Sequence, residues 1–375
     1  MVQKVMRGRG ELRDIVKMTE QLKIRRPMIV GTGPLPGMLL RKAPQLLDCP
    51  VFSEFHPNPD LGDACSGVRL FREQECDGLI SVGGGSSIDT AKAVKALMYA
   101  DTPENAAGGA LPEKMPLKHI AVPATAGTGS EATQTAVVYM DGRKLSLNHA
   151  GLLPDGVVLD ASLLDTLPLY HKKSCALDAL AQGIESYWCR SANDDSRVHA
   201  YLAILGVLDN LKAYLDGDPH AADEMLDASY QSGKAIQITR TTAAHAMSYM
   251  LTKTMGYAHG HAVMLTLPAL WDMMAEQEDM KGVLAEITRI MRLGDPRMVS
   301  RMLRGILYSL DMEIPAMPGN EELAFLADSV NTERLGNHPV QMGPDDVREA
   351  YRLAFTPVCD AEKQACIDIW KYYGT

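Results

Sequence analysis

A short apolar run followed by three consecutive glycines constrains the fold more than any other stretch of this chain. Leu79, Ile80 and Val82 form an apolar run bounded by glycines, which is typical of a buried parallel strand. After the glycines, apolar residues recur at helical spacing as far as Met98. The sequence therefore predicts a strand, a glycine turn and a helix in direct succession.

This glycine turn has the composition of a phosphate-binding site. A helix N-terminus offers unpaired N–H groups and a positive dipole end, and Gly83, Gly84 and Gly85 would let a diphosphate approach the backbone. Ser86 can cap the helix or donate to a phosphate oxygen. A tight turn without a ligand is the alternative, but three glycines followed by two serines are unusual for a turn alone. The pattern is neither G-x-G-x-x-G nor a P-loop.

Strands and helices alternate along the first part of the chain, which predicts a parallel, doubly wound α/β sheet. The expected strands are 27–30, 50–52, 79–82, 119–123 and 157–160. Asp141-Gly142, between apolar alternations, predicts a hairpin over 135–147. A second loop rich in glycine and hydroxyl groups, 124–131, follows the strand at 119–123. Both loops lie at carboxyl ends of strands, where such sheets bind ligands.

After Leu167-Pro168 the pattern becomes helical and stays so to the C-terminus. The expected helices lie near 171–190, 195–215, 219–238, 259–277, 281–294, 297–311, 321–330, 344–354 and 360–373. Since 375 residues are many for one core, two domains are expected. We place an α/β domain at 1–165 and a helical domain at 166–375.

Charge and cysteine content limit the classes of partner. The net charge of −10 argues against nucleic acid, although local cations could still bind a small anionic substrate. No apolar run reaches membrane-spanning length, so no membrane partner is expected. The seven cysteines form no C-x-x-C pair, and no signal peptide is recognised. These features predict a reduced, cytoplasmic protein.

A group of polar residues stands out in the helical half. Asp178 and Gln182 are four residues apart and share a helix face, and Glu185 adds a second acid. His245 and His259 are each flanked by small apolar residues, and such histidines are more often hydrogen-bonded core residues when taken alone. Beside an Asp/Gln face, two of them would suit a divalent metal. The residues by themselves leave both interpretations open.

Taken together, the motifs resemble the iron-containing (group III) alcohol dehydrogenases over nearly the whole chain. The resemblance rests on the glycine turn with Asp89 and Lys92, the Thr125–Glu131 loop, Lys144, Leu153-Pro154-Asp155 with Asp160, the Asp178 helix, and His245 and His259 at the family's fourteen-residue separation. It implies a dehydroquinate synthase-like fold, with an N-terminal dinucleotide-binding domain that has a parallel sheet and an all-helical C-terminal domain.

The resemblance also implies ligand sets. The family's four metal ligands, for Fe(II) or Zn(II), map onto Asp178, Gln182, His245 and His259. An NAD(P)H cofactor would contact Gly83, Gly84, Gly85, Ser86, Asp89, Thr125, Thr128 and Ser130, with Lys144 at its ribose. No acid follows the first strand at Gly31-Thr32-Gly33, so both NADH and NADPH stay open.

Two departures from the family pattern narrow the subfamily. Gln182 stands where the family has His, and Tyr249 replaces a further active-site His. With these, the segments 55–59, 178–188, 245–249 and 259–263 resemble the phosphonoacetaldehyde reductases of phosphonate biosynthesis. This resemblance implies reduction of phosphonoacetaldehyde to 2-hydroxyethylphosphonate by hydride transfer from NAD(P)H.

Roles follow for individual residues. A metal on Asp178, His245 and His259 would polarise the carbonyl, and Tyr249 or His261 would supply the proton, directly or through water. The phosphonate needs cations, for which the candidates are Arg240 and Lys253, five residues before and eight after His245. Both could equally be solvated surface residues. The alternatives are a dehydrogenase of another short alcohol or polyol, and an inactive nucleotide-binding relative; a homodimer is left open.

Overall fold

The structure, a computed structural model, describes residues 3–57, 59–140, 142–330 and 335–373. The chain divides into two compact units, one formed by Met1–Leu167 with Asp216–Gly233 and the other by Pro168–Leu215 with Lys234–Thr375. Because residues 216–233 return to the first unit, a division at a single point does not describe these units. The predicted domains, 1–165 and 166–375, stay a prediction.

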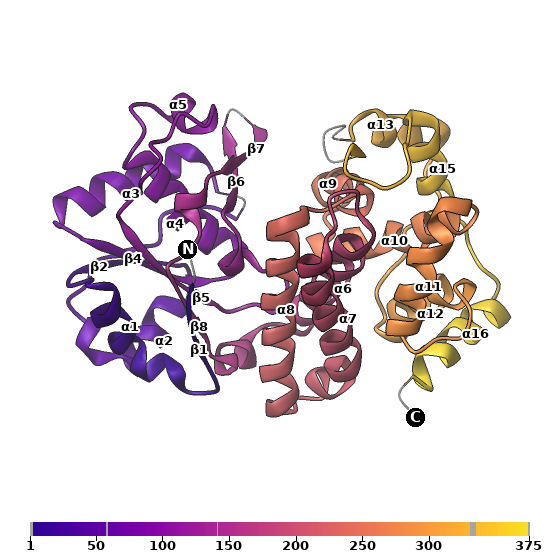
Figure 1. Cartoon of the computed structure of the whole chain (residues 1–375), viewed down its shortest axis with the longest axis horizontal. Coiled ribbons are helices and arrows are strands. Elements are labelled where there is room, and N and C mark those ends of the chain that lie inside the picture. The colour runs from indigo at the N-terminus through magenta and orange to yellow at the C-terminus, as the bar shows by residue number, and fades with distance from the viewer. Residues whose placement is uncertain (1–2, 58, 141, 331–334, 374–375) are drawn as a thin grey trace. The chain divides into compact units, whose positions relative to one another are not determined.

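The first unit is built on a six-stranded sheet with strand order β1-β8-β5-β4-β2-β3 (Figure 1). Every neighbouring pair in it is parallel. The strands are β1 (Lys4–Arg7), β2 (Pro27–Val30), β3 (Val51–Phe52), β4 (Gly78–Gly83), β5 (Lys118–Pro123) and β8 (Gly156–Leu159). The helices are α1 (Ile15–Leu22), α2 (Leu35–Lys42), α3 (Leu61–Glu73), α4 (Gly85–Leu97) and α5 (Pro103–Ala107). The predicted α/β fold is confirmed.

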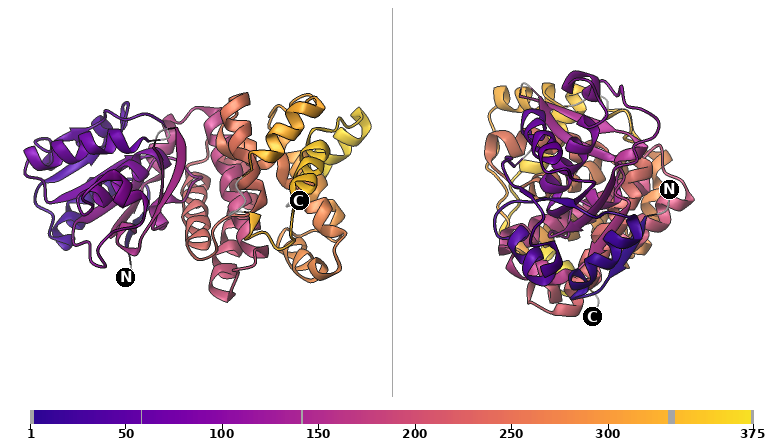
Figure 2. Two further views of the ribbon diagram at one scale, coloured as in Figure 1. Left: turned by 90° about the horizontal axis from the view of Figure 1, so that it is seen from above. Right: turned by 90° about the vertical axis from the view of Figure 1, so that its left-hand side faces the viewer.

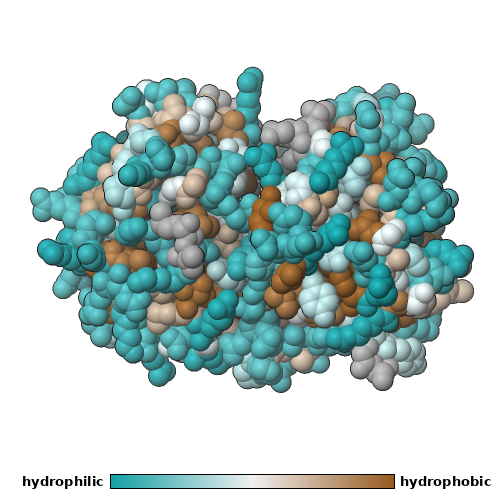
Figure 3. All heavy atoms as spheres, in the orientation of Figure 1, coloured by the Kyte–Doolittle hydropathy of each residue, from teal (hydrophilic) through white to brown (hydrophobic). Residues whose placement is uncertain are grey.

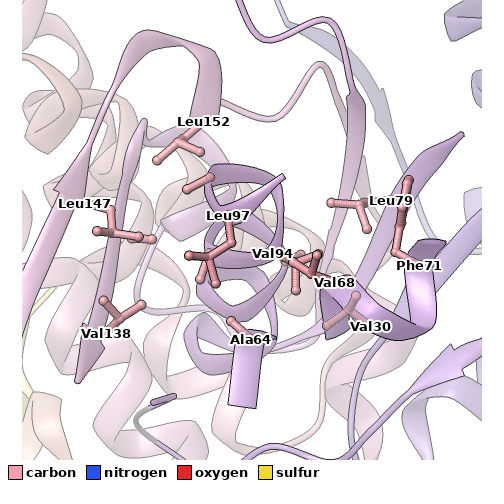
Figure 4. Close-up of a cluster of buried hydrophobic side chains, with 14 of the residues drawn as sticks. Val30, Ala64, Val68, Phe71, Leu79, Val94, Leu97, Val138, Leu147 and Leu152 are labelled. Carbon is pink, nitrogen blue, oxygen red and sulfur yellow. The ribbon is translucent and has the colours of Figure 1, made fainter. Parts of the chain in front are cut away.

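Apolar side chains pack on both faces of this sheet. Successive residues of a strand point to opposite faces, and Leu79 and Ile80 accordingly belong to two different core clusters. The Leu79 cluster includes residues of α3 and α4 (Figure 4), whereas the Ile80 cluster includes residues of α1 and α2. The helices thus form a layer on each side of the strands (Figure 2), which explains why β4 has apolar residues on both faces, Leu79 on one and Ile80 on the other.

The predicted hairpin is present as β6 (Thr135–Met140) and β7 (Arg143–Asn148), paired antiparallel. Asp141, in its turn, lies outside the described residues, as does Asn58 in the 55–59 segment. The hairpin contributes Val138 and Leu147 to the core cluster around α4 (Figure 4), and α4 packs directly against β6. The hairpin therefore extends the core on the α4 side of the sheet.

Among its described residues, the second unit contains helices and connecting loops and no strand. Its helices are α6 (Leu169–Trp188), α7 (Asp194–Leu215), α9 (Ala243–Met255), α10 (His259–Ala275), α11 (Lys281–Ile290), α12 (Arg297–Ser309), α13 (Asn320–Asp328), α15 (Pro344–Phe355) and α16 (Asp360–Lys371), while α8 (Pro219–Thr239) begins in the first unit and ends in the second. Among the described helices, none is long and apolar enough to span a bilayer. On the face drawn in Figure 3, hydrophilic residues predominate, with hydrophobic residues scattered among them.

Five of these helices and strands are absent from the expected set: β1, α1, α2, α5 and α9. β1 is a short edge strand with two basic ends, so it has little of the apolar character of a buried strand. α9 is buried over most of its length, so polar residues such as His245 and Ser248 lie in the interior and not on a solvent-exposed face.

Candidate cofactor and metal sites

The glycine turn joins β4 directly to α4, as predicted. Gly83 has a φ of 153°, and a Cβ there would lie 2.2 Å from Ser87 Oγ, so only glycine fits. Gly84 and Gly85 are partly exposed, and a Cβ on either would approach a threonine methyl, that of Thr125 or Thr128, at 3.1 Å. The N-cap residue of α4 is Gly84, which has no side chain to cap the helix. This leaves a glycine-lined helix N-terminus beside two threonines, a cradle that fits a phosphate group.

The threonine-bearing loop 124–131 is tied to α4 by a buried network. Lys92 Nζ donates to the backbone oxygens of Ser130 and Thr135, at 2.7 and 2.8 Å, and to Thr133 Oγ1 at 3.0 Å. Asp89 accepts from Ser130 Oγ and from the backbone N–H of Val137, the latter at 2.9 Å. Asp89 and Ser130, both expected at the cofactor, are thus buried in contacts that position the loop.

The backbone of the same loop also makes a short contact with the backbone of α8. Gly129 has a φ of 59°, and a Cβ on it would lie 2.4 Å from the Cα of Gly233. This contact requires glycine on both sides, since a Cβ on Gly233 would lie 2.3 Å from the Gly129 oxygen. It helps to explain why residues 216–233 pack with the first unit.

Lys144 lies on β7, paired in register with Tyr139 of the hairpin, and is partly buried.

The predicted metal ligands come together in the second unit. Asp178, His245 and His259 each offer one donor atom, and these atoms lie within 4.8 Å of one another. Asp178 Oδ1 is 3.1 Å from His245 Nε2 and 3.9 Å from His259 Nε2. Gln182, one turn after Asp178 on α6, hydrogen-bonds its carboxylate. Oxygen and imidazole donors in this arrangement fit a divalent ion such as Zn(II) or Fe(II).

A close helix contact brings His259 to this cluster. His259 is the first residue of α10, and a Cβ on the next residue, Gly260, would lie 2.0 Å from the Ser174 carbonyl oxygen and 2.8 Å from the Asp178 backbone nitrogen. Because Gly260 has no side chain, the start of α10 can pack directly against α6 beside Asp178. His259 remains 41% exposed, whereas the Asp178 and His245 side chains are 4% and 3% exposed. The cluster is therefore buried on the Asp178 side and accessible at His259.

Charge in the cluster favours a cation. Burial raises the pKa of Asp178, but His259, His245 and Gln182 outweigh it and leave the pKa below its usual value. Burial lowers the pKa of His245, yet Glu185 and Asp178 raise it to about 9. At neutral pH the imidazole is therefore protonated on both nitrogens and positively charged, between two carboxylates. A metal ligand must give up one of these protons, and a bound cation would supply the positive charge in its place.

His261, a predicted proton donor, has both ring nitrogens engaged by protein groups. Its Nε2 lies 2.8 Å from the carbonyl oxygen of Glu313, which can only accept, so Nε2 carries the hydrogen. Nδ1 then accepts from the Tyr170 hydroxyl at 3.0 Å. Burial lowers the pKa of His261, which keeps the ring neutral. These contacts favour a role in fixing the start of α10, and they leave Tyr249 as the stronger candidate for the proton.

Tyr249 and the two candidate cations lie on or next to α9. Residues 245, 249 and 253 are four apart and share a helix face, and Lys253 Nζ lies 6.0 Å from the centre of the Tyr249 ring. Lys253 is exposed. Arg240 is also exposed, in a left-handed conformation with φ of 61°, directly after α8. Of the two cations, Lys253 is the one on the His245 face.

Comparison with known families decides the classification. Residues 3–161 match the family model of the iron-containing alcohol dehydrogenases, and residues 173–355 match the C-terminal model of the same family. The chain belongs to this family. The first match includes the glycine turn and the second includes the polar cluster, so both candidate sites lie inside the matched regions.

Individual relatives agree with this classification. The chain is 35% identical over 234 residues to the Escherichia coli protein named "Probable alcohol dehydrogenase EutG", covering 60% of this chain and 58% of that protein. It is 35% identical over 228 residues to the phosphonoacetaldehyde reductase of Streptomyces viridochromogenes, covering 57% and 58%. The matched part therefore spans about three-fifths of the length of these curated relatives.

Solved structures match over almost the whole chain. Sulfoacetaldehyde reductase from Bifidobacterium kashiwanohense, in complex with NAD⁺, superposes with a TM-score of 0.86 at 25% identity, covering 94% of this chain and 97% of that one. An iron-containing alcohol dehydrogenase from Thermotoga maritima gives a TM-score of 0.82 at 26% identity, covering 95% and 98%. The predicted dehydroquinate synthase-like fold is thereby confirmed.

Proposed function

We propose that this iron-type alcohol dehydrogenase is an NAD(P)H-dependent aldehyde reductase that converts phosphonoacetaldehyde to 2-hydroxyethylphosphonate. The observation that carries the proposal is the cluster of Asp178, His245 and His259, which offers three ligands and an accessible side. Three protein ligands with an open position is the usual arrangement of a catalytic ion. Two relatives support the choice of substrate, since their names describe two-carbon aldehydes with an anionic group, phosphonoacetaldehyde and sulfoacetaldehyde.

Each part of the chemistry has candidate residues in this chain. Asp178, His245 and His259 would hold Fe(II) or Zn(II), with the Gln182 amide as a weaker fourth donor. When bound, the ion would polarise the aldehyde carbonyl and the nicotinamide would supply the hydride. Tyr249, one turn from His245, would hold the proton destined for the substrate oxygen. The second unit would thus bind and orient the aldehyde.

Lys253 is the preferred partner for the phosphonate. It lies two turns beyond His245, about 12 Å along the axis of α9. Helical side chains lean toward the N-terminus, so the Lys253 side chain leans toward Tyr249 and His245, in agreement with its position near the Tyr249 ring. A long, flexible cation at this place could bind an anionic group while the aldehyde end reaches the metal ligands. Arg240 stays a second, weaker candidate.

The cofactor would bind on the first unit. Its diphosphate would lie on Gly84, Gly85 and Ser86 at the N-terminus of α4, where the helix dipole favours an anion. Thr125 and Thr128 would contact the nucleotide, and Lys144 its ribose. Use of NADPH as well as NADH, a homodimer and a cytoplasmic location stay predictions.

A substrate panel tests the proposal. The purified, metal-loaded protein is mixed with NADH or NADPH and with phosphonoacetaldehyde, propanal or a polyol-derived aldehyde, and the nicotinamide absorbance band is followed. We expect stoichiometric oxidation of the cofactor with phosphonoacetaldehyde at a kcat/KM well above that for propanal. A higher kcat/KM for uncharged aldehydes would show that phosphonoacetaldehyde is not the substrate. If the protein binds the cofactor tightly but reduces none of the aldehydes, it is a catalytically inactive relative.

A further inference from the structure

The structure points to a role for Glu185 that sequence reasoning did not assign: we infer that Glu185 sets the tautomer of His245 and so positions it as a metal ligand. This inference rests on the proposed metal site. Glu185 lies on α6, one turn beyond Gln182, and is completely buried. Its carboxylate faces the N-terminus of α9, on the opposite side of the His245 ring from Asp178.

The Glu185 carboxylate accepts hydrogen bonds whose directions are fixed, one of them from the Thr242 backbone. Its Oε1 accepts from the backbone N–H of Ala244 at 2.8 Å and from Thr242 Oγ1 at 2.6 Å. Trp188 Nε1 donates to the same threonine oxygen at 3.2 Å, which turns the hydroxyl hydrogen toward the carboxylate. The other carboxylate oxygen, Oε2, faces Nδ1 of His245.

The direction of these bonds determines which imidazole nitrogen can bind a metal. An ionised carboxylate can only accept, so Nδ1 of His245 must carry a hydrogen. In the neutral ring, the lone pair then lies on Nε2, the atom 3.1 Å from Asp178 Oδ1. That is the atom that belongs to the ligand cluster. Glu185 therefore selects the tautomer in which His245 can share an ion with Asp178 and His259.

Replacing Glu185→Gln reverses this selection with almost no change of shape. The Ala244 N–H can only donate, so the amide oxygen of the glutamine must take the place of Oε1. Its NH₂ group then faces Nδ1 of His245 and donates to it. The hydrogen of the neutral ring moves to Nε2, and that nitrogen can no longer bind a metal.

Thr242→Val provides the matched control. It removes one hydrogen bond to the same carboxylate and leaves a side chain of similar size, while Oε2 still faces Nδ1. A role limited to local packing predicts similar losses in both variants. The tautomer role predicts a large loss of metal affinity in Glu185→Gln alone.

The test uses the full chain and Zn²⁺ as the probe. Metal-free protein is titrated with Zn²⁺ in competition with a chromophoric chelator, and thermal unfolding of each metal-free variant confirms that it is folded. We expect Glu185→Gln to weaken Zn²⁺ binding by roughly 10- to 100-fold, the usual effect of losing an outer hydrogen-bond partner of a metal ligand, and Thr242→Val to change it much less. Equal affinity in Glu185→Gln and wild type, or equal losses in both variants, overturns the inference.

A spectroscopic readout makes the conclusion independent of the variants' stability. In Zn²⁺-loaded wild-type protein with ¹⁵N-labelled histidine, we expect the His245 ring to be protonated at Nδ1 and metal-bound at Nε2. The reverse assignment overturns the role of Glu185 even if Glu185→Gln does not fold. If no Zn²⁺ binding of the wild-type chain is lost on replacing Asp178, both the proposed metal site and this inference are wrong. If Zn²⁺ binds at that site and Glu185→Gln does not weaken it, only this inference is wrong.

Discussion

Glu131 allows a quantitative test of the buried network around the loop 124–131. The residue follows Ser130, is 1% exposed, and its Oε1 has no hydrogen-bond partner among the described residues. Burial raises the pKa of its carboxyl group from 4.5 to about 7, although Lys92 acts in the opposite direction. An ionised Glu131 is therefore costly in the folded protein near neutral pH.

The pH range of this cost follows from the two pKa values. Between pH 4.5 and 7 the folded state binds a proton at Glu131 that the unfolded state has released. Stability must then fall as the pH rises through this range. The shift corresponds to about 3 kcal/mol, because one pKa unit equals about 1.4 kcal/mol. The full loss is present above pH 7 and is absent below pH 4.5.

Glu131→Gln removes the ionisation and keeps the shape. We expect the variant to be more stable than wild type by up to about 3 kcal/mol at pH 8, with little difference at pH 4.5. Glu113→Gln is the control, since it makes the same charge change at an exposed position of the same unit. The control should give no pH-dependent difference.

The assay must report the first unit by itself. Tryptophan fluorescence is unsuitable, because Trp188, Trp271 and Trp370 all belong to the second unit. Hydrogen exchange of peptides from β4 and β5, corrected for the intrinsic exchange rate at each pH, measures the opening free energy where it is needed. An infrared band of protonated carboxyl, present at pH 6 in wild type and lost in Glu131→Gln, checks the pKa directly. Equal stabilisation at both pH values, without such a band, would refute the reasoning.

Three further outcomes are expected. Gly84→Asp places a negative charge where the diphosphate should approach, and repulsion of about 4 kcal/mol at 4 Å predicts at least a hundredfold weaker NADH binding in a fluorescence titration; unchanged affinity contradicts the placement. Asp178→Ala should abolish both Zn²⁺ retention and turnover while Gln182→His tightens retention, and full activity in protein shown by elemental analysis to be metal-free would exclude a catalytic ion. Lys253→Ala should raise KM for phosphonoacetaldehyde about tenfold or more and leave that for propanal unchanged; equal effects on both would remove Lys253 from the substrate site.

Individual strands, turns and helices could be predicted from the sequence, whereas most of the tertiary contacts between them could not. The strand, turn and helix at 78–97 could be predicted because the apolar run, the glycines and the helical spacing all agree there. The role of Asp89 could not, because its partners, Ser130 and Val137, are distant in the chain. A carboxylate beside a phosphate turn suggests a ligand contact, and only the tertiary network shows that it ties down the opposite loop.

The metal cluster illustrates the same division. That Asp178 and Gln182 share a face follows from the period of a helix. That His259 reaches them depends on Gly260, whose missing side chain lets α10 lie against the backbone of α6. The chemistry depends further on Glu185, because a histidine becomes a ligand only when its other nitrogen is fixed. Spacing can indicate which residue types could form a site, but the direction of a hydrogen bond decides which atom faces the ion.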